Sequence, residues 1–245
     1  MILVLSLCSC QAREAETGQP AGKNTAEEAV SRGELLSTVD LMSGAEADAE
    51  ATNKTYAGKY YLMNLVVDSL SDPEYIRAGF NLRTSLPVQT MYFTVDLPEE
   101  EREGLTYGDV LQVAGKIDKI EQRHNGTIFV EVSDARCVTK TFQVSGTVEA
   151  IEALYDNNLV IRDDSGHVFP NSVITVDSPG NGSYKEGDRI TATGTLRGGE
   201  REGHICLDLD SWPFYMEHPE SVELVTSQEY KGIAAWKKRV FLFVV

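Results

Sequence analysis

The sequence predicts a mainly β protein with two tandem five-stranded barrels, preceded by a short helical segment. Three observations lead to this prediction. From residue 56 onward, hydrophobic and polar residues alternate with a period of two, in runs rich in β-branched and aromatic residues. Five such runs occur in the same order twice. Paired glycines recur at equal spacing in both halves of the chain, which periodicity alone does not produce.

The chain is large enough for a hydrophobic core and is strongly acidic. It has 245 residues, of which 42% are hydrophobic and 24% are charged. Its 22 Lys and Arg residues stand against 38 Asp and Glu residues, which gives a net charge of -16. A surface of this charge repels polyphosphate unless a local basic patch offsets it. The composition therefore disfavours a protein that coats nucleic acid.

The first ten residues resemble a bacterial lipoprotein signal. They read MILVLSLCSC and are followed by a polar stretch. The resemblance implies that Leu7 and Ser9 are recognition positions, that Cys10 is the acylated residue, and that the residues before it are removed. It departs from the pattern because no Lys or Arg precedes the apolar run, so we expect the natural start to lie upstream. The alternative is a frayed apolar terminus or a buried first strand, since ten residues are too few to span about 30 Å of hydrocarbon.

Residues 11–24 are predicted to be a flexible tether, and residues 25–55 a helical lead-in to the first barrel. The tether is polar and contains the turn-prone residues 17–22. Thr25 and Glu28 have the spacing of a capping box. Apolar residues then recur at helical spacing, which predicts one or two short helices: Leu35, Leu36, Val39 and Met42.

The strands of both predicted barrels are bounded by turn residues. The first barrel, residues 56–140, has strand candidates at 60–70, 76–83, 88–96, 110–120 and 127–138. The second barrel, residues 141–218, has candidates at 142–153, 158–162, 167–176, 189–197 and 204–212. In each, a longer connection separates the third strand from the fourth, which is typical of the OB-fold, a small Greek-key barrel.

Two glycine turns mark the repeat. Gly108-Asp109 precedes the fourth strand of the first barrel, and Gly187-Asp188 precedes the fourth strand of the second. Gly115 and Gly194 follow at the same interval of seven residues. The Gly-Asp pair supplies a tight turn, and the later glycine permits a bulge or a sharp bend. We interpret all of them as structural, because none belongs to a phosphate-binding loop.

A short motif leads into the first strand: Ala49, Asn53, Tyr56, Gly58 and Lys59. Further matching positions are Glu34 to Leu36, Val66-Val67, Leu105 to Asp109, and Gly115. With this motif the chain resembles the tRNA-anticodon-like OB-fold family of bacterial envelope proteins, over about residues 34–140 and more weakly over 141–215. The family name records similarity of fold to anticodon-binding barrels and does not imply that the chain binds tRNA.

Residues 219–245 are predicted to be a C-terminal tail. A basic stretch, Lys237 to Arg239, precedes the apolar end, Val240 to Val245. Six apolar residues are too few to cross a membrane. Three interpretations stay open: an added strand, an interfacial segment on anionic lipid, or the start of a longer hydrophobic helix.

Catalytic and metal chemistry have little basis in the sequence. The cysteines, Cys8, Cys10, Cys137 and Cys206, include no C-x-x-C pair. His204 and Cys206 share one predicted strand face, but two ligands do not make a metal site. No Ser or Cys stands out as a nucleophile, and acidic runs such as Glu99 to Glu101 are typical of solvated loops. We therefore expect no catalytic residues, no metal and no cofactor.

Single-stranded nucleic acid is the main alternative ligand, because OB barrels bind it with a basic groove and stacking aromatics. The candidate basic clusters are Lys116, Lys119 and Arg123 in the first barrel, and Arg197 and Arg201 in the second. Acids interrupt both clusters, at Asp118, Glu121, Glu200 and Glu202. The candidate stacking residues are Tyr60, Tyr61, Tyr92, Phe93 and Phe129, although strand aromatics in small barrels more often belong to the core.

Taken together, the sequence predicts a membrane-tethered lipoprotein of the bacterial cell envelope, on the periplasmic or extracellular side. It is expected to act as a non-catalytic binding module through its OB-like barrels. The expected ligand is a protein or an oligosaccharide, because the acidic charge disfavours phosphate. The alternatives are a single-stranded nucleic-acid-binding OB protein and, third, a periplasmic enzyme, which requires a convergent polar pocket.

Overall fold

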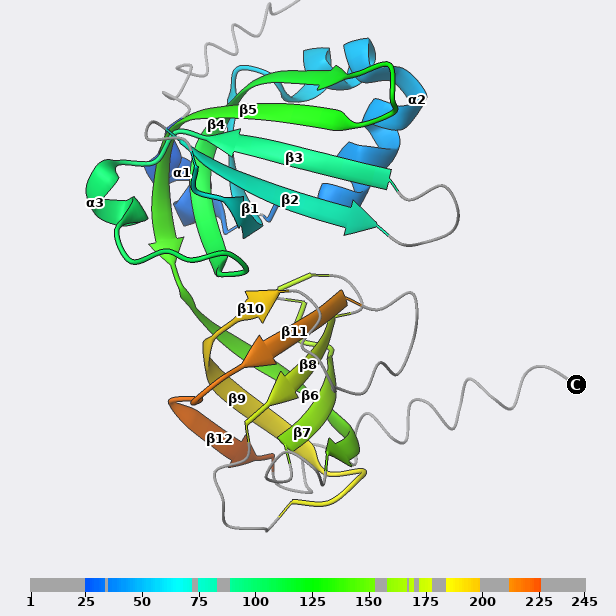
Figure 1. Cartoon of the computed structure of the whole chain (residues 1–245), viewed down its shortest axis with the longest axis vertical. Coiled ribbons are helices and arrows are strands. Elements are labelled where there is room, and N and C mark those ends of the chain that lie inside the picture. Colours follow the sequence, from blue (N-terminus) through cyan, green and yellow to red (C-terminus); the bar gives the residue numbers. More distant parts are fainter. Residues whose placement is uncertain are drawn as a thin grey trace, which may run out of the picture.

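The computed structural model describes residues 25–33, 35–71, 75–82, 89–152, 158–166, 168–169, 172–177, 184–198 and 212–225 (Figure 1). The predicted signal with Cys10, the predicted tether, and the predicted tail from residue 226 onward lie outside the described residues. Among the described residues, no helix has the length and apolar character needed to cross a membrane.

Two helices precede the strands. α1 (Ala26–Arg32) begins at Thr25, whose hydroxyl accepts a hydrogen bond from the N–H of Glu28 at 3.3 Å. α2 (Thr38–Tyr56) begins at Ser37 in the same way. Three residues of α2 are fully buried and join the core of the first barrel: Leu41, Met42 and Ala45. α2 thus covers part of the barrel, as predicted, whereas Leu35 and Leu36 lie between the helices, and Leu35 forms a β-bridge with Leu62.

The first unit is a closed five-stranded barrel, which confirms the prediction for this half of the chain. Its strands are β1 (Lys59–Ser69), β2 (Ile76–Leu82), β3 (Gln89–Val95), β4 (Val110–Gln122) and β5 (Ile128–Thr139). They close in the order β1-β2-β3-β5-β4, and only the β3–β5 pair is parallel. This is an OB-like Greek-key barrel. The short helix α3 (Glu99–Arg102) lies in the long connection between β3 and β4.

The second unit corrects the sequence prediction: it is a curled seven-stranded sheet and not a five-stranded barrel. Its strands are β6 (Thr141–Glu152), β7 (Asn158–Asp163), β8 (Ser172–Val176), β9 (Arg189–Thr195), β10 (Arg197–Gly198), β11 (Trp212–Met216) and β12 (Ser221–Leu224). Their order is β10-β11-β8-β7-β6-β9-β12. As in the first unit, one pair, β8 and β11, is parallel.

Two non-local contacts explain the difference. The predicted fourth strand divides at Leu196, because the carbonyl of Leu196 accepts a hydrogen bond from the N–H of Val110 in the first barrel, at 3.0 Å. The segment predicted as a tail adds β12 to the edge of β9. β11 begins at Trp212, whereas the sequence predicts a strand at 204–212; residues 204–211 lie outside the described residues.

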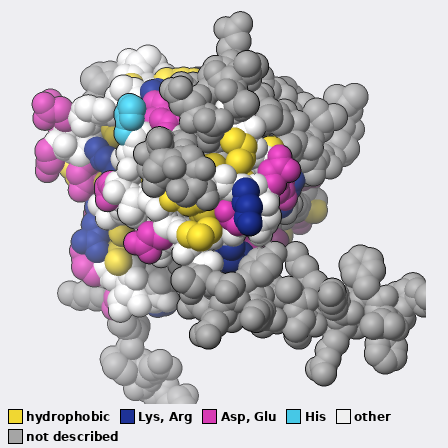
Figure 2. All heavy atoms as spheres, turned by 90° about the horizontal axis from the view of Figure 1, so that it is seen from below, with side chains coloured by type: hydrophobic (Ala, Val, Ile, Leu, Met, Phe, Trp, Pro, Cys, Tyr) yellow, Lys and Arg dark blue, Asp and Glu magenta, His cyan; other side chains and the backbone are white. Residues whose placement is uncertain are grey.

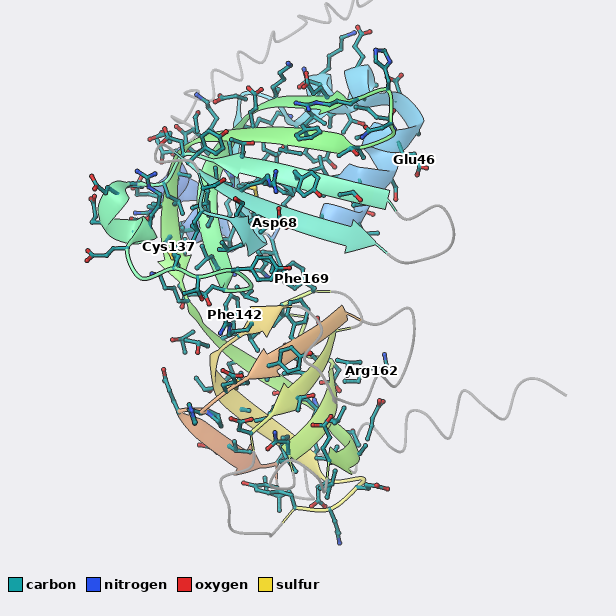
Figure 3. All side chains as sticks on the ribbon, in the orientation of Figure 1. Glu46, Asp68, Cys137, Phe142, Arg162 and Phe169 are labelled. Atoms are coloured by element: carbon teal, nitrogen blue, oxygen red, sulfur yellow. The ribbon has the colours of Figure 1, made fainter. Side chains whose placement is uncertain are left out.

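The two units share one continuous hydrophobic core. A single residue, Lys140, separates β5 from β6. The N–H of Gly198 donates to the carbonyl of Gly108 at 2.7 Å, so the turn that precedes β4 is paired with β10. Phe169, labelled at the junction in Figure 3, stacks on Phe214 with ring centroids 5.1 Å apart. The units are therefore packed together and not joined by a linker.

Candidate ligand-binding face

The outer face of β2, β3 and β5 carries two aromatic side chains side by side. In β3, Met91, Phe93 and Val95 point into the core and are fully buried, so Tyr92 between them points outward. In β5, Phe129 points outward for the same reason. Both aromatic residues are half-buried. Figure 1 shows β2 and β3 in front of the barrel, with α1 and α2 behind it.

The two rings are held as a pair and flanked by arginines. Tyr92 and Phe129 are register partners of β3 and β5, and their ring centroids lie 5.7 Å apart. The Cζ atom of Arg77 lies 4.9 Å from the Tyr92 centroid, and that of Arg123 lies 3.8 Å from the Phe129 centroid. Both are cation–π contacts. We call Arg77, Tyr92, Phe129 and Arg123 the aromatic row.

Acidic side chains pair with the cations of this face. The carboxylate of Asp68 accepts from Nε of Arg77 at 2.8 Å. Glu121 lies 2.5 Å from Nζ of Lys119 and 3.8 Å from Nε of Arg123. The hydrogen bond between Lys119 and Glu121 raises the pKa of the lysine and lowers the pKa of the glutamate. The guanidinium and ammonium charges beside the aromatic row are therefore offset.

The basic clusters predicted as nucleic-acid contacts are offset in the same way. Nζ of Lys116 lies 3.0 Å from Asp118. Arg197 is not near this face: it lies at the junction, where it donates to the carbonyl of Tyr107 at 2.7 Å. Arg201 lies outside the described residues. On the face seen in Figure 2, Lys and Arg side chains likewise lie next to Asp and Glu side chains.

The other predicted stacking residues are engaged elsewhere. Phe93 is fully buried in the core. Tyr61 packs against the core beside Tyr56, with ring centroids 5.6 Å apart. Tyr60 donates its hydroxyl hydrogen bond to Asp134, and this bond raises the pKa of Tyr60 to about 12. Of the five predicted aromatics, the structure therefore brings only Tyr92 and Phe129 together on one outer face.

Sequence reasoning missed the two arginines of the aromatic row as partners of these rings. The signal for Tyr92 is present, because it stands between the inward-pointing Met91 and Phe93. Arg77 and Arg123 come from β2 and from the β4–β5 hairpin. Their positions over the rings depend on strand register, which a local pattern does not specify.

The two predicted Gly-Asp turns begin with matching glycine geometry. The φ angle of Gly108 is 89° and that of Gly187 is 87°. The N–H of Gly108 donates to the carbonyl of Val67 at 2.8 Å, and the N–H of Gly187 donates to the carbonyl of Val148 at 2.9 Å. Each glycine thus fixes its turn to the first strand of its own unit.

The aspartates close the two turns. Asp109 accepts a hydrogen bond from the N–H of Thr106 at 2.7 Å, and Asp188 accepts one from the N–H of Lys185 at 2.9 Å. Asp109 also lies 3.7 Å from Nε of Arg197, so this turn forms part of the junction. Both turns therefore position the strands that follow them.

Gly115 and Gly194 lie where neighbouring side chains leave little room for a Cβ atom. A Cβ at Gly115 would lie 2.6 Å from Cγ1 of Val132 on β5. A Cβ at Gly194 would lie 3.0 Å from Cγ of Met216 on β11. The β4–β5 register also shifts beside Gly115. Both glycines therefore permit close packing inside a curled sheet.

The short motif that leads into the first strand, with Asn53 and Gly58, has a structural role. Oδ1 of Asn53 accepts a hydrogen bond from the N–H of Ile120 at 2.7 Å. Gly58, with a φ of 78°, donates its N–H to the carbonyl of Ile117 at 2.7 Å. These bonds flank the point where β4 shifts its register against β5. The motif therefore fixes the end of α2 to β4.

Metal-ligating side chains are not clustered in the described part of the chain. There, no group of three or more His, Cys, Asp or Glu residues is placed to hold a metal ion. Cys137 is half-buried, its N–H donates to the carboxylate of Glu101, and burial raises the pKa of its thiol. A raised pKa makes a thiol less reactive. His204 and Cys206 lie outside the described residues.

Comparison with known proteins finds similarity among solved structures. No known protein family matches the chain, and no curated protein matches its sequence. Among solved structures, the chain is similar to the wild-type single-stranded DNA binding protein from Thermus aquaticus, with a TM-score of 0.27 and 12% sequence identity. The similarity covers 68% of this chain and 92% of that one. It says nothing about the ligand of the present chain.

Proposed function

We propose that this protein is a non-catalytic binding module of the bacterial cell envelope, and that the outer face of β2, β3 and β5 holds its ligand. The observation that carries the proposal is the aromatic row. It combines two half-buried rings with adjacent hydrogen-bonding groups on the strand face that OB barrels use for extended ligands. Outward-facing aromatic pairs are typical of binding surfaces, because rings provide contact area at low entropic cost.

We further propose that the second unit arose by duplication of the barrel and that the protein is tethered to the envelope by lipid. The matched turns at Gly108 and Gly187, and the single parallel strand pair in each unit, support an origin of the second unit from a duplicated OB-like barrel. The resemblance to the envelope family and the Leu7-to-Cys10 pattern support a lipid-tethered protein. A protein or an oligosaccharide is the proposed ligand, and single-stranded nucleic acid is the alternative.

The ligand face is tested by an NMR titration of the whole protein with three probes: soluble oligosaccharides, peptides, and a single-stranded oligonucleotide. A ligand of this face shifts the amide signals of β3 and β5, and Tyr92→Ala and Phe129→Ala each weaken its binding by about tenfold, given about 1–3 kcal/mol per stacked ring. Tyr107→Ala is the control, because Tyr107 is an exposed aromatic residue, at 67%, that lies at the junction and not on this face. Equal effects of all three substitutions would contradict the proposal.

The tether is tested separately by detergent partitioning of the full chain, expressed behind a basic signal region. The parent protein is expected to enter the detergent phase, because each buried CH₂ of an acyl chain contributes about 0.8 kcal/mol. Cys10→Ala should stay in the aqueous phase, whereas Cys8→Ala should behave as the parent does. Equal partitioning of the parent and Cys10→Ala would rule out lipid attachment at this residue.

A further inference from the structure

A second row of polar side chains runs beside the aromatic row on the same outer face. Thr94 of β3 and Glu131 of β5 are register partners, and Lys119 of β4 is the partner of Glu131 on its other side. Because side chains two residues apart on a strand share a face, Thr94 and Glu131 lie next to Tyr92 and Phe129. The face thus presents hydrogen-bonding groups directly beside the ring pair.

Glu131 is the free acceptor of this row. It is exposed, and its carboxylate forms no hydrogen bond or ion pair with the described residues, although its charge contributes to the raised pKa of Lys119. The ammonium group of Lys119, its neighbour, is held 2.5 Å from Glu121 instead. An unpaired carboxylate accepts hydrogen bonds strongly and offers none. The hydroxyl of Thr94, beside it, can both donate and accept.

The charge of the face disfavours an anionic ligand. Three cations lie on or beside the two rows, and three acids accompany them: Arg77, Arg123 and Lys119 against Asp68, Glu121 and Glu131. The net charge of this surface is therefore about zero, since the three positive and the three negative charges cancel at neutral pH. Phosphate binding needs an excess of cations, because it draws on the release of counterions. The unpaired carboxylate of Glu131 adds local repulsion.

The closed barrel also disfavours an extended peptide. Peptides bind sheets most readily by adding a strand to a free edge. β2, β3 and β5 each have a paired strand on both sides, so this face offers side chains and no free backbone edge. A ligand here has to be recognised by ring stacking and by side-chain hydrogen bonds.

From these features we infer that the face binds a neutral oligosaccharide, whose sugar rings lie against Tyr92 and Phe129 and whose hydroxyl groups donate to Glu131. Sugar hydroxyls supply the donors that an unpaired carboxylate requires, and an uncharged chain meets no repulsion from it. The flanking guanidinium groups provide further donors toward sugar oxygens. The inference rests on the proposed function and specifies its ligand.

The test is a calorimetric titration of the folded protein with a neutral gluco-oligosaccharide, and with a uronic-acid oligosaccharide of the same length. We expect the neutral sugar to bind at least tenfold more tightly. Glu131→Ala should weaken its binding by about tenfold or more, because hydrogen bonds to a charged acceptor are about twice as strong as neutral ones. Glu131→Gln keeps an acceptor oxygen and should lose less. Glu223→Ala, at an exposed acid on β12, is the matched control and should bind as the parent does.

The outcomes separate the inference from the proposed function. Tighter binding of the uronic-acid chain, or an equal loss in Glu131→Ala and Glu223→Ala, would overturn the inference. Binding of the peptide or the oligonucleotide alone, with dependence on Tyr92, would overturn the inference and leave the proposed function in place. Failure of all probes to shift the signals of β3 and β5 would overturn both. Circular dichroism of each variant checks that the fold is retained.

Discussion

Nδ2 of Asn64 on β1 donates a hydrogen bond to the backbone carbonyl of Val168 in the second unit, at 2.5 Å. Asn64 is 1% exposed, and its Oδ1 accepts from Nε2 of Gln112 at 3.2 Å. A buried amide with partners in both units fixes their relative position, because leaving either partner unsatisfied is costly. The two halves of the chain therefore behave as one folded body.

Asn64→Ala is expected to lower the free energy of unfolding by about 1–3 kcal/mol, since it leaves the Val168 carbonyl unsatisfied in the core. Urea unfolding followed by tryptophan fluorescence and by circular dichroism measures the effect. The parent should show one coincident transition, and Asn64→Ala should separate the two signals or shift both midpoints downward. Gln112→Ala, which removes only the half-buried partner, should have a smaller effect. An unchanged midpoint in Asn64→Ala would show that the junction is not stabilised by this bond.

The matched turns predict an order of stability losses. Valine at Gly108 or Gly187 is strained, because both φ angles are near 90° and β-branched residues avoid positive φ. A Cβ at Gly108 would also lie 3.0 Å from the carbonyl oxygen of Gly198, whereas none of the described atoms lies within 4 Å of one at Gly187. Thermal unfolding should therefore give the lowest midpoint for Gly108→Val, followed by Gly187→Val. Asp188→Ala loses one turn hydrogen bond, about 0.5–1.5 kcal/mol, and should be the mildest.

Asn53→Ala is expected to destabilise the protein by about 1–2 kcal/mol, because it leaves the Ile120 N–H without its acceptor where β4 shifts register. Asn53→Asp keeps an acceptor oxygen and serves as the matched variant. Amide hydrogen exchange should show faster exchange at Ile120 in Asn53→Ala than in the parent. Equal protection at Ile120 in both proteins would argue against a structural role for this motif residue.

How far the sequence specifies this molecule depends on how local the relevant contacts are. Alternation locates the strands of the first barrel, because each strand buries one face against the same core. The division of the predicted fourth strand at Leu196 is different, since it arises from a hydrogen bond to Val110, which is distant in the chain. The candidate face shows the same contrast between local and non-local contacts. Tyr92 can be placed outward from its neighbours, whereas Arg123 reaches Phe129 only through strand pairing.

The hydrogen bond from Tyr60 to Asp134 predicts a pH-dependent contribution to stability. It raises the pKa of Tyr60 in the folded protein to about 12, with smaller effects from burial and from Asp118 and Glu27. The unfolded value is about 10. A group whose pKa is raised by folding stabilises the fold below its unfolded pKa, and this contribution is lost as the pH rises through the folded pKa.

The parent should therefore be more stable than Tyr60→Phe below about pH 10, and the difference should disappear as the pH approaches 12. Urea unfolding at a series of pH values measures it. Asp134→Asn is the matched variant, because Asn tolerates the positive φ of 49° at this position and removes the charge. It should return the pKa of Tyr60 toward its ordinary value in an ultraviolet titration. A stability difference that persists at the highest pH would contradict this account.

The paired charges of the first barrel lead to a final prediction about nucleic acid. Lys116, Lys119 and Arg123 each have a carboxylate within 4.0 Å, so they offer little net attraction to phosphate. The parent protein should show no useful affinity for a labelled single-stranded oligonucleotide at about 0.15 M salt. The double variant Asp118→Asn and Glu121→Gln removes the acids and keeps the three cations.

This double variant should bind the oligonucleotide measurably, with an affinity that falls as salt is added. Three phosphate contacts on a single strand predict a slope of log affinity against log salt of about -2. Adding Lys116→Glu to the double variant should reduce that slope by about 0.7, because one contact is lost. Fluorescence anisotropy at several salt concentrations measures both quantities. Tight, salt-dependent binding by the parent itself would show that its acids do not offset the basic cluster, and would favour nucleic acid as the ligand of the aromatic row.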